Sequence, residues 1–242
     1  MNVETDAIVL KSINTASTRK IIVLFTKKFG KISAGTSLYK DSKNKNSLLI
    51  KPFTYGNYNL YKKNDFYSIN KGEIKSNFFS IGEDIDKYLI ACKVLEITEK
   101  ILVDEDAQPK VFNLLYDFLT IISQRKKRFE ALLIVYIIKL LSELGYAPQL
   151  DNCVECGRDD NHTYFDIKAG GIVCADCNSV DSLIFKLEKS IIDILKFLIN
   201  TPIQRLVKID ISDEIVKNIM EILEAYILYH LDIKLKLTEI SI

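Results

Sequence analysis

Two Cys-x-x-Cys pairs constrain the fold of this chain more than any other feature. Cys153 and Cys156 form the first pair, Cys174 and Cys177 form the second, and 17 residues separate the two pairs. This spacing is typical of a tetrahedral four-cysteine zinc site, in which each pair makes a tight turn whose sulfurs converge on one cation. Because four protein ligands leave no open coordination position, we expect a structural Zn²⁺ ion rather than a catalytic one.

Other interpretations of the four cysteines are two disulfides, a redox Cys-x-x-Cys motif or four unrelated thiols. No signal peptide is apparent, so we expect a cytoplasmic protein, and disulfides are disfavoured in that compartment. A redox motif would need a thioredoxin-like βαβ context, which the flanking sequence does not offer. His162 lies inside the same module and is at best a spare ligand.

The composition is that of a folded protein with a large core. Hydrophobic residues make up 48% of the 242 residues and charged residues 27%, which is not the composition of a disordered chain. The longest apolar run spans residues 131–141 and is interrupted only by Lys139. A run of this length is too short to span a bilayer, so we expect a buried helix there and a soluble protein.

The net charge of +1 conceals an uneven distribution of charge. Residues 1–80 hold 14 Lys/Arg against 5 Asp/Glu, whereas residues 81–242 hold 19 against 27. This asymmetry favours a first segment that meets a polyanion, although an unevenly charged solvated surface is an equally good explanation from charge alone.

The first eighty residues predict a small β-barrel. Five segments are rich in β-branched and aromatic residues and are separated by short turn-like connections: residues 5–12, 20–26, 31–38, 48–61 and 66–73. Five strands with short connections favour an OB-fold, a barrel that commonly binds oligonucleotides, with an SH3-like barrel as the alternative.

The predicted barrel also carries the residues that we expect to bind DNA. Lysines pair with phosphates, and exposed aromatic rings stack on unpaired bases. The basic candidates are Arg19, Lys20, Lys40, Lys43, Lys45, Lys51, Lys62 and Lys63. Five aromatic residues lie among them, namely Tyr39, Phe53, Tyr55, Tyr58 and Tyr61. Since strand alternation buries half of the side chains, each single tyrosine is a better candidate for the core than for a base contact.

The pattern becomes helical after Gly82. The first helix should bury a stripe made of Ile85, Leu89, Cys92, Leu95 and Leu102, which makes Cys92 a core thiol. A second helix should begin near Pro109 and bury Phe112, Leu115, Leu119 and Ile122. A third, apolar nearly all round, carries Leu133, Ile137, Leu140 and Leu144 and should end at Gly145.

Two further helices follow the cysteine module. Their apolar positions are Leu187, Ile191, Ile194 and Leu198 in one, and Ile215, Ile219, Ile222, Tyr226 and Tyr229 in the other, with Ser212 as its expected N-cap. We therefore expect an α+β protein. Its parts are an OB-like barrel at 1–80, helices at 81–150 and 179–242, and a zinc module at 151–178 inserted into the helical bundle.

The run from Arg125 to Arg128 lies between the second and third expected helices. A solvated turn near a helix C-terminus is the favoured explanation, and a secondary DNA contact is the alternative. Motifs of phosphate-binding, dinucleotide-binding or hydrolytic enzymes do not occur in the sequence, and His230 falls beside an apolar stripe. We therefore expect a binding protein and not an enzyme.

The ordered set of motifs resembles the bacterial recombination mediator family RecO. Near the start of the chain, the resemblance rests on Glu4, on residues 7–10, 24–26 and 30–32, and on Pro52-Phe53. Its most specific parts are residues 129–133 and residues 145–151, which lead into the first cysteine pair. Phe165, Gly170-Gly171 and the second pair complete it. One departure is the Lys-rich segment 38–46, where the family often has glycine and arginine.

The resemblance implies a role in DNA repair by the RecF pathway. Proteins of this family bind single- and double-stranded DNA and anneal complementary strands without ATP. They contact RecR and the C-terminal tail of single-stranded DNA-binding protein, so that RecA can replace that protein on gaps. It also implies a cytoplasmic protein that joins the nucleoid during repair. An alternative function also remains open: a non-enzymatic protein–protein adaptor with a structural zinc and no DNA binding.

Overall fold

The computed structural model describes residues 1–15, 20–36, 45–159, 162–178 and 183–239. It divides into two compact units, Met1–Gln124 and Arg125–Ile242, which are described separately below. The expected boundaries near residues 80, 150 and 178 remain predictions.

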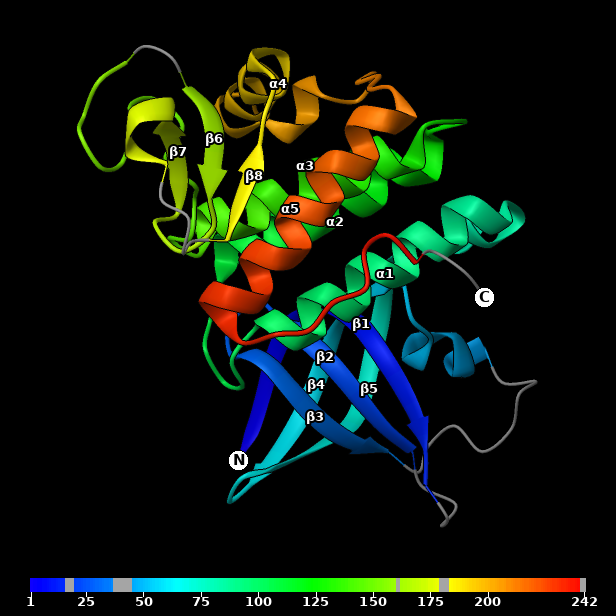
Figure 1. The fold of residues 1–242 in the computed structure, drawn as a ribbon. Helices are drawn as coiled ribbons and strands as arrows, with labels where there is room; N and C mark the ends of the chain where they lie inside the picture. The colour runs from blue at the N-terminus through cyan, green and yellow to red at the C-terminus, as the bar shows by residue number, and fades with distance from the viewer. Residues whose placement is uncertain (16–19, 37–44, 160–161, 179–182, 240–242) are drawn as a thin grey trace. The chain divides into compact units, whose positions relative to one another are not determined.

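The first unit contains a closed five-stranded barrel (Figure 1). Its strands are β1 (Asn2–Asn14), β2 (Lys20–Thr26), β3 (Gly30–Thr36), β4 (Thr54–Lys63) and β5 (Phe66–Asn77). They follow the order β1-β2-β3-β5-β4, with β4 paired back onto β1. All neighbours are antiparallel except β3 and β5. The expectation of an α+β chain that starts with a five-stranded OB-like barrel is confirmed.

Strand alternation fills the barrel interior with apolar side chains. Ile22 and Leu24 of β2, Tyr58 and Leu60 of β4, and Ile69 of β5 are almost fully buried. The Tyr58 hydroxyl donates a 2.7 Å hydrogen bond to the Leu49 carbonyl, which satisfies the one polar atom that this ring carries inward. Tyr58 is therefore a core residue and not a DNA contact.

One expected strand is wrong over its first half. Residues predicted as the start of a strand at 48 instead form the 3₁₀ helix η1 (Lys45–Ile50), and β4 begins only at Thr54. Phe53 has a left-handed backbone with φ of 68°, so the chain cannot continue as a strand through it. Leu49 packs where a side chain at Gly72 would meet it at 2.7 Å, so the helix seals the barrel over a glycine.

Two helices complete the first unit, α1 (Ile85–Ile101) and α2 (Pro109–Gln124), after the 3₁₀ helix η2 (Phe79–Glu83). All four residues expected on the buried face of α2 are buried. The expected stripe of α1 is confirmed only at Leu95 and Leu102, whereas Ile85 is 57% exposed. The rest of the buried face is built from Ile90, Val94, Ile97 and Ile101. Cys92 is accordingly half-buried rather than a core thiol.

The second unit packs α4 (Lys189–Asn200) and α5 (Asp213–Leu231) against α3 (Phe129–Glu143). Eleven of the fifteen residues of α3 are buried, which confirms the prediction of a central helix. Gly145 follows with φ of 84° and ends it as expected. Ser212 is the N-cap of α5, but its side chain makes no capping hydrogen bond. The short 3₁₀ helix η4 (Ile203–Arg205) precedes α5.

The cysteine module adds a small sheet to the second unit. Its strands are β6 (His162–Asp166), β7 (Gly171–Cys174) and β8 (Ile184–Lys186), in the order β7-β6-β8. β6 pairs antiparallel with both β7 and β8. Across the described residues, every helix is too short or too polar to cross a membrane.

Candidate metal centre and nucleic-acid surface

The backbone of the cysteine module turns each pair of sulfurs toward one point. In the first pair, the Cys153 amide donates to the Arg158 carbonyl and the Gly157 amide to the Cys153 carbonyl, each at 2.8 Å. Gly157 has φ of 74°, a conformation that an L side chain disfavours. In the second pair, Cys174 ends β7 and Cys177 ends the 3₁₀ helix η3 (Ala175–Cys177).

The four thiol sulfurs lie within 4.8 Å of one another. The Sγ atoms of Cys156 and Cys174 are 3.8 Å apart. A tetrahedral zinc with Zn–S bonds of about 2.3 Å separates its sulfurs by about 3.8 Å, whereas a disulfide requires about 2.05 Å. All four thiols are free. The arrangement fits a four-coordinate metal with soft ligands and contradicts paired disulfides.

Hydrogen bonds to the sulfurs favour the thiolate form that a metal requires. Arg158 donates from Nε to Cys156 at 3.4 Å and from Nη2 to Cys174 at 3.5 Å. This guanidinium lowers the pKa of Cys156 to about 6. Burial would raise the pKa of Cys153, but backbone hydrogen bonds outweigh burial and lower it. Hydrogen bonding to Cys174 raises the pKa of Cys177 to about 12, so metal binding must release a proton there.

Two histidines lie in or near this module. The backbone of His162 opens β6, and its side chain lies outside the described residues. His230 is half-buried on α5 and its Nε2 atom lies 2.7 Å from the Ile167 carbonyl oxygen. That contact ties α5 to the chain just after β6, which is a structural role.

The basic residues expected to bind DNA are spread along the barrel. Lys20 begins β2, and Lys51 is exposed in the turn before β4. Lys45 begins η1, but its side chain lies outside the described residues, as do Arg19, Lys40 and Lys43 altogether. Among the described residues, the ammonium groups of Lys20 and Lys51 have no carboxylate within salt-bridge distance.

Lys62 and Lys63 are neighbours in sequence but lie on opposite faces of β4. Lys62 bonds at 2.8 Å to both Glu105 and the Tyr67 hydroxyl, and its ammonium lies 4.7 Å from the Tyr67 ring centroid. These contacts raise the pKa of Lys62 and satisfy its charge within the unit. Lys63 is exposed on the other face. Of the two lysines, only Lys63 presents an uncompensated charge to a polyanion.

Other lysines of the barrel are also paired with carboxylates of the same unit. Lys11 bonds Glu99 at 3.2 Å and Lys31 contacts Asp104 at 3.1 Å. The Lys75 ammonium lies 2.7 Å from Asp6. Burial would raise the pKa of Asp6, but hydrogen bonds from Lys75, Asn57 and Tyr55 outweigh it and hold the pKa below its usual value. The basic charge of the barrel is therefore smaller than the sequence count indicates.

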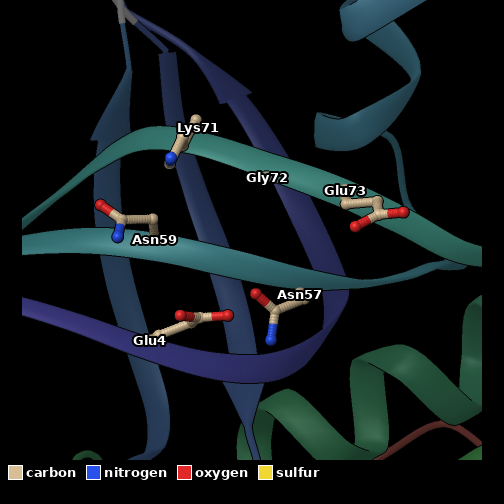
Figure 2. A pocket seen from close by; sticks show the side chains of 6 residues that line it. All are labelled: Glu4, Asn57, Asn59, Lys71, Gly72 and Glu73. Atoms are coloured by element: carbon tan, nitrogen blue, oxygen red, sulfur yellow. The ribbon is translucent and has the colours of Figure 1, made fainter.

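The outward face of β1, β4 and β5 carries a shallow polar depression of about 290 Å³ (Figure 2). Its lining residues are Glu4, Asn57, Asn59, Lys71, Gly72 and Glu73. Figure 2 shows that these polar side chains come from three neighbouring strands. The mixed charges of the depression do not by themselves select an anion.

Two consecutive segments of the chain match the two domain profiles of one protein family. Residues 1–78 match the profile described as recombination protein O N terminal, and residues 82–239 match recombination protein O C terminal. The chain belongs to the RecO family. The resemblance seen in the sequence is thereby confirmed, and with it the assignment to DNA repair and recombination.

Relatives in several bacteria carry the name DNA repair protein RecO. The protein from Thermoanaerobacter sp. is 31% identical over 96% of this chain and 94% of its own length. The protein from Caldanaerobacter subterraneus is 30% identical with the same coverage. The protein from Alkaliphilus metalliredigens is 28% identical over 96% of this chain and 95% of its own.

Several residues of these sites escaped the sequence analysis of this RecO-family chain. Arg158 lies two positions after Cys156, yet no spacing rule for zinc ligands predicts a cation that donates to their sulfurs. Lys71 was absent from the basic candidates. Alternation from the buried Tyr67 and Ile69 would have pointed it inward, but a register shift between Asn59 and Leu60 places it opposite the outward Asn59. Arg125 and Arg128 proved to be bound within the second unit. Arg125 donates to the carbonyls of Val207 and Ile209, and Arg128 pairs with Asp210 and Asp213.

Proposed function

We propose that this chain is a DNA-binding recombination mediator that anneals complementary single strands without ATP. In this proposal it helps RecA replace single-stranded DNA-binding protein on gapped DNA, in the RecF pathway. Its partners would be single- and double-stranded DNA, RecR and the C-terminal tail of single-stranded DNA-binding protein. It would act in the cytoplasm as a binding protein without catalytic turnover, and join the nucleoid during repair.

The observation that carries the proposal is family membership over both domains, joined to a barrel with the OB strand order. OB barrels bind single strands in a groove with positive charge and aromatic rings. Lys20, Lys51 and Lys63 extend from the barrel without carboxylate partners among the described residues. We assign Lys40, Lys43 and Lys45 to the same role from the sequence.

The cysteine site would hold a structural Zn²⁺ through Cys153, Cys156, Cys174 and Cys177. The fit between the sulfur spacing and a tetrahedral thiolate shell supports this assignment. The ion would stabilise the zinc module at 151–178, which lies in the sequence between the helical segments 81–150 and 179–242. The DNA-binding barrel would comprise residues 1–80.

A protein adaptor without DNA binding is the second candidate. Ion pairs within the first unit neutralise Lys11, Lys31, Lys62 and Lys75, and this observation favours it. The two candidates differ in one measurable property: the mediator binds DNA with an affinity that depends on salt, and the adaptor does not bind DNA.

Fluorescence anisotropy of a labelled single-stranded oligonucleotide, titrated at several salt concentrations, distinguishes the candidates. We expect binding whose log–log salt slope is about −0.7 per phosphate neutralised. Changing Lys40, Lys43 and Lys45 together to Glu should weaken binding and flatten that slope, and Lys217→Glu, an exposed position on α5 in the second unit, serves as the control. If the folded wild-type protein binds no oligonucleotide even at low salt, the DNA-binding proposal is rejected and the protein adaptor remains as the candidate function.

A further inference from the structure

The β4–β5 hairpin presents two aromatic rings to solvent. Inward positions of the hairpin are held by Leu60, Tyr67 and Ile69, which are at most 5% exposed. Tyr61 and Phe66 point the other way and are 43% and 77% exposed. Among the described residues neither ring has an aromatic or cation–π partner. A single exposed ring is common on protein surfaces, so the informative feature is that two such rings occur on one hairpin.

The register places these rings and one lysine on a single face. Lys63 lies opposite Phe66, and Tyr61 lies opposite Ser68. Residues paired across two strands point to the same face, so Tyr61, Lys63 and Phe66 share the outward side. Tyr61 and Phe66 are diagonal neighbours, a relation that separates side chains by about 7–8 Å.

Polar groups extend this face toward the depression shown in Figure 2. Asn59 is the next outward residue of β4 after Tyr61, and its amide lies near that of Asn70, with Nδ2 of Asn70 3.5 Å from Oδ1 of Asn59. Lys71 lies opposite Asn59 and adds a second exposed ammonium, level with Glu4 on β1, while Glu73 lies opposite Asn57, farther from the hairpin end. Lys63, opposite Phe66, is therefore the exposed ammonium nearest the two rings, and Asp65 lies in the turn between the strands.

We propose that the outward face of the β4–β5 hairpin is a stacking surface for the unpaired bases of single-stranded DNA. The rings of Phe66 and Tyr61 stack on bases, and the Lys63 ammonium contacts a phosphate. Only single strands fit, because the bases of a duplex do not expose their faces to side chains. The loop between the fourth and fifth strands is one of two loops through which OB barrels contact oligonucleotides. This inference rests on the proposed function and adds where and how the strand is held.

A tryptophan reporter tests the stacking directly. The natural chain has no Trp, so Phe66→Trp introduces the only indole. We expect an oligothymidylate to quench its fluorescence and an abasic strand of equal length and charge to leave it unchanged. Phe197→Trp is the matched control, because Phe197 is 52% exposed on α4 in the other unit. Equal quenching by the abasic strand, or none by either strand, would overturn the stacking assignment.

Affinity measurements separate stacking from charge. Phe66→Ala and Tyr61→Ala should each weaken oligothymidylate binding about tenfold and leave the salt slope unchanged, because no charge is lost. Lys63→Ala should reduce the magnitude of that slope by about 0.7, and Phe197→Ala should bind as the wild type does. If the wild type binds with a steep salt slope and both aromatic variants bind equally well, the inference fails and the proposed function stands. If the wild type binds no DNA, both fail.

Discussion

At the residue scale, Arg158 is placed to stabilise the thiolates of the four-cysteine cluster. Its guanidinium donates to the sulfurs of Cys156 and Cys174 and forms a 2.7 Å salt bridge with Asp176. Four thiolates around Zn²⁺ leave a net charge of −2, and a cation that donates to two of the sulfurs lowers their basicity toward protons and electrophiles.

We expect Arg158→Ala to release zinc about tenfold faster than the wild type in the presence of a chromogenic chelator, in line with the loss of partners of metal ligands. Adding free guanidinium to Arg158→Ala should not slow zinc release to the wild-type rate. Arg158→Lys should slow it only in part, because an ammonium cannot reproduce the planar fork of donors of a guanidinium. Glu155→Ala, a change beside the same ligands, is the control. A release rate equal to that of the wild type in Arg158→Ala would show that the hydrogen bonds to sulfur do not retain the metal.

At the same scale, the sequence predicts the cysteine cluster better than it predicts the residues around it. The four cysteines were found because a metal demands fixed residue types at fixed spacing. Lys62 and Lys63 look alike in sequence, but strand alternation sends one to Glu105 and Tyr67 and the other to solvent. Partner residues such as Glu105 lie far along the chain, so no local pattern separates a paired lysine from a free one.

At the scale of elements, the turn before α3 is held by a single side chain. Arg125 donates to the carbonyls of Lys127 and Arg128 within the turn, and to those of Val207 and Ile209 before α5. It therefore fixes the segment that leads into α5 against the start of α3. The expected solvated turn with free cations is replaced, for this residue, by an internal tie.

Arg125→Ala should lower the free energy of unfolding of the second unit by about 2–3 kcal/mol, because several carbonyl groups lose a charged donor. Urea unfolding followed by circular dichroism measures the change. Lys126→Ala is the matched control in the same run, since Lys126 is exposed. If Arg125→Ala is as stable as Lys126→Ala, the hydrogen bonds of Arg125 do not stabilise the second unit. A DNA contact by the Arg125–Arg128 run would then be the better explanation of these residues.

Helix periodicity predicted the buried residues well where apolar residues gather on one face of the helix, and poorly where they occur on more than one face. In α2 one face carries most of the apolar residues, and all four predicted core positions are buried. In α1 apolar residues occur on more than one side, so the stripe through Ile85 and Cys92 competed with the one through Ile90, Val94 and Ile97 that is buried. Packing against the rest of the unit decides between them, and the helix alone does not.

At the scale of the whole molecule, the charge asymmetry of the sequence takes on a different meaning. The acidic segment around residues 96–106 supplies partners for lysines of the preceding barrel, as in Lys11–Glu99, Lys31–Asp104 and Lys62–Glu105. A boundary drawn at residue 80 separates these partners and exaggerates the basic charge of the barrel. The fold class could be predicted from strand count and cysteine spacing, but the effective charge depends on pairs distant in sequence.

The cysteine module is joined to the rest of the second unit by specific contacts. The Gln149 amide donates to the Gly170 carbonyl at 2.9 Å, and the ring centroids of Phe165 and Tyr226 are 6.0 Å apart. His230 adds its contact with the Ile167 carbonyl. Because a structural metal couples binding to folding, loss of the ion should spread through these contacts to α5.

We therefore expect Cys153→Ser and Cys174→Ser to lose bound zinc and to destabilise residues 125–242 by several kcal/mol. Amide hydrogen exchange followed by mass spectrometry should speed up in β6, β7 and α5 while the strands of the barrel keep their protection. Cys92→Ser is the control, because Cys92 lies outside the four-cysteine cluster. It should keep the zinc content of the wild type. If either cluster variant retains full zinc content and unchanged exchange in α5, the ion does not hold this unit together.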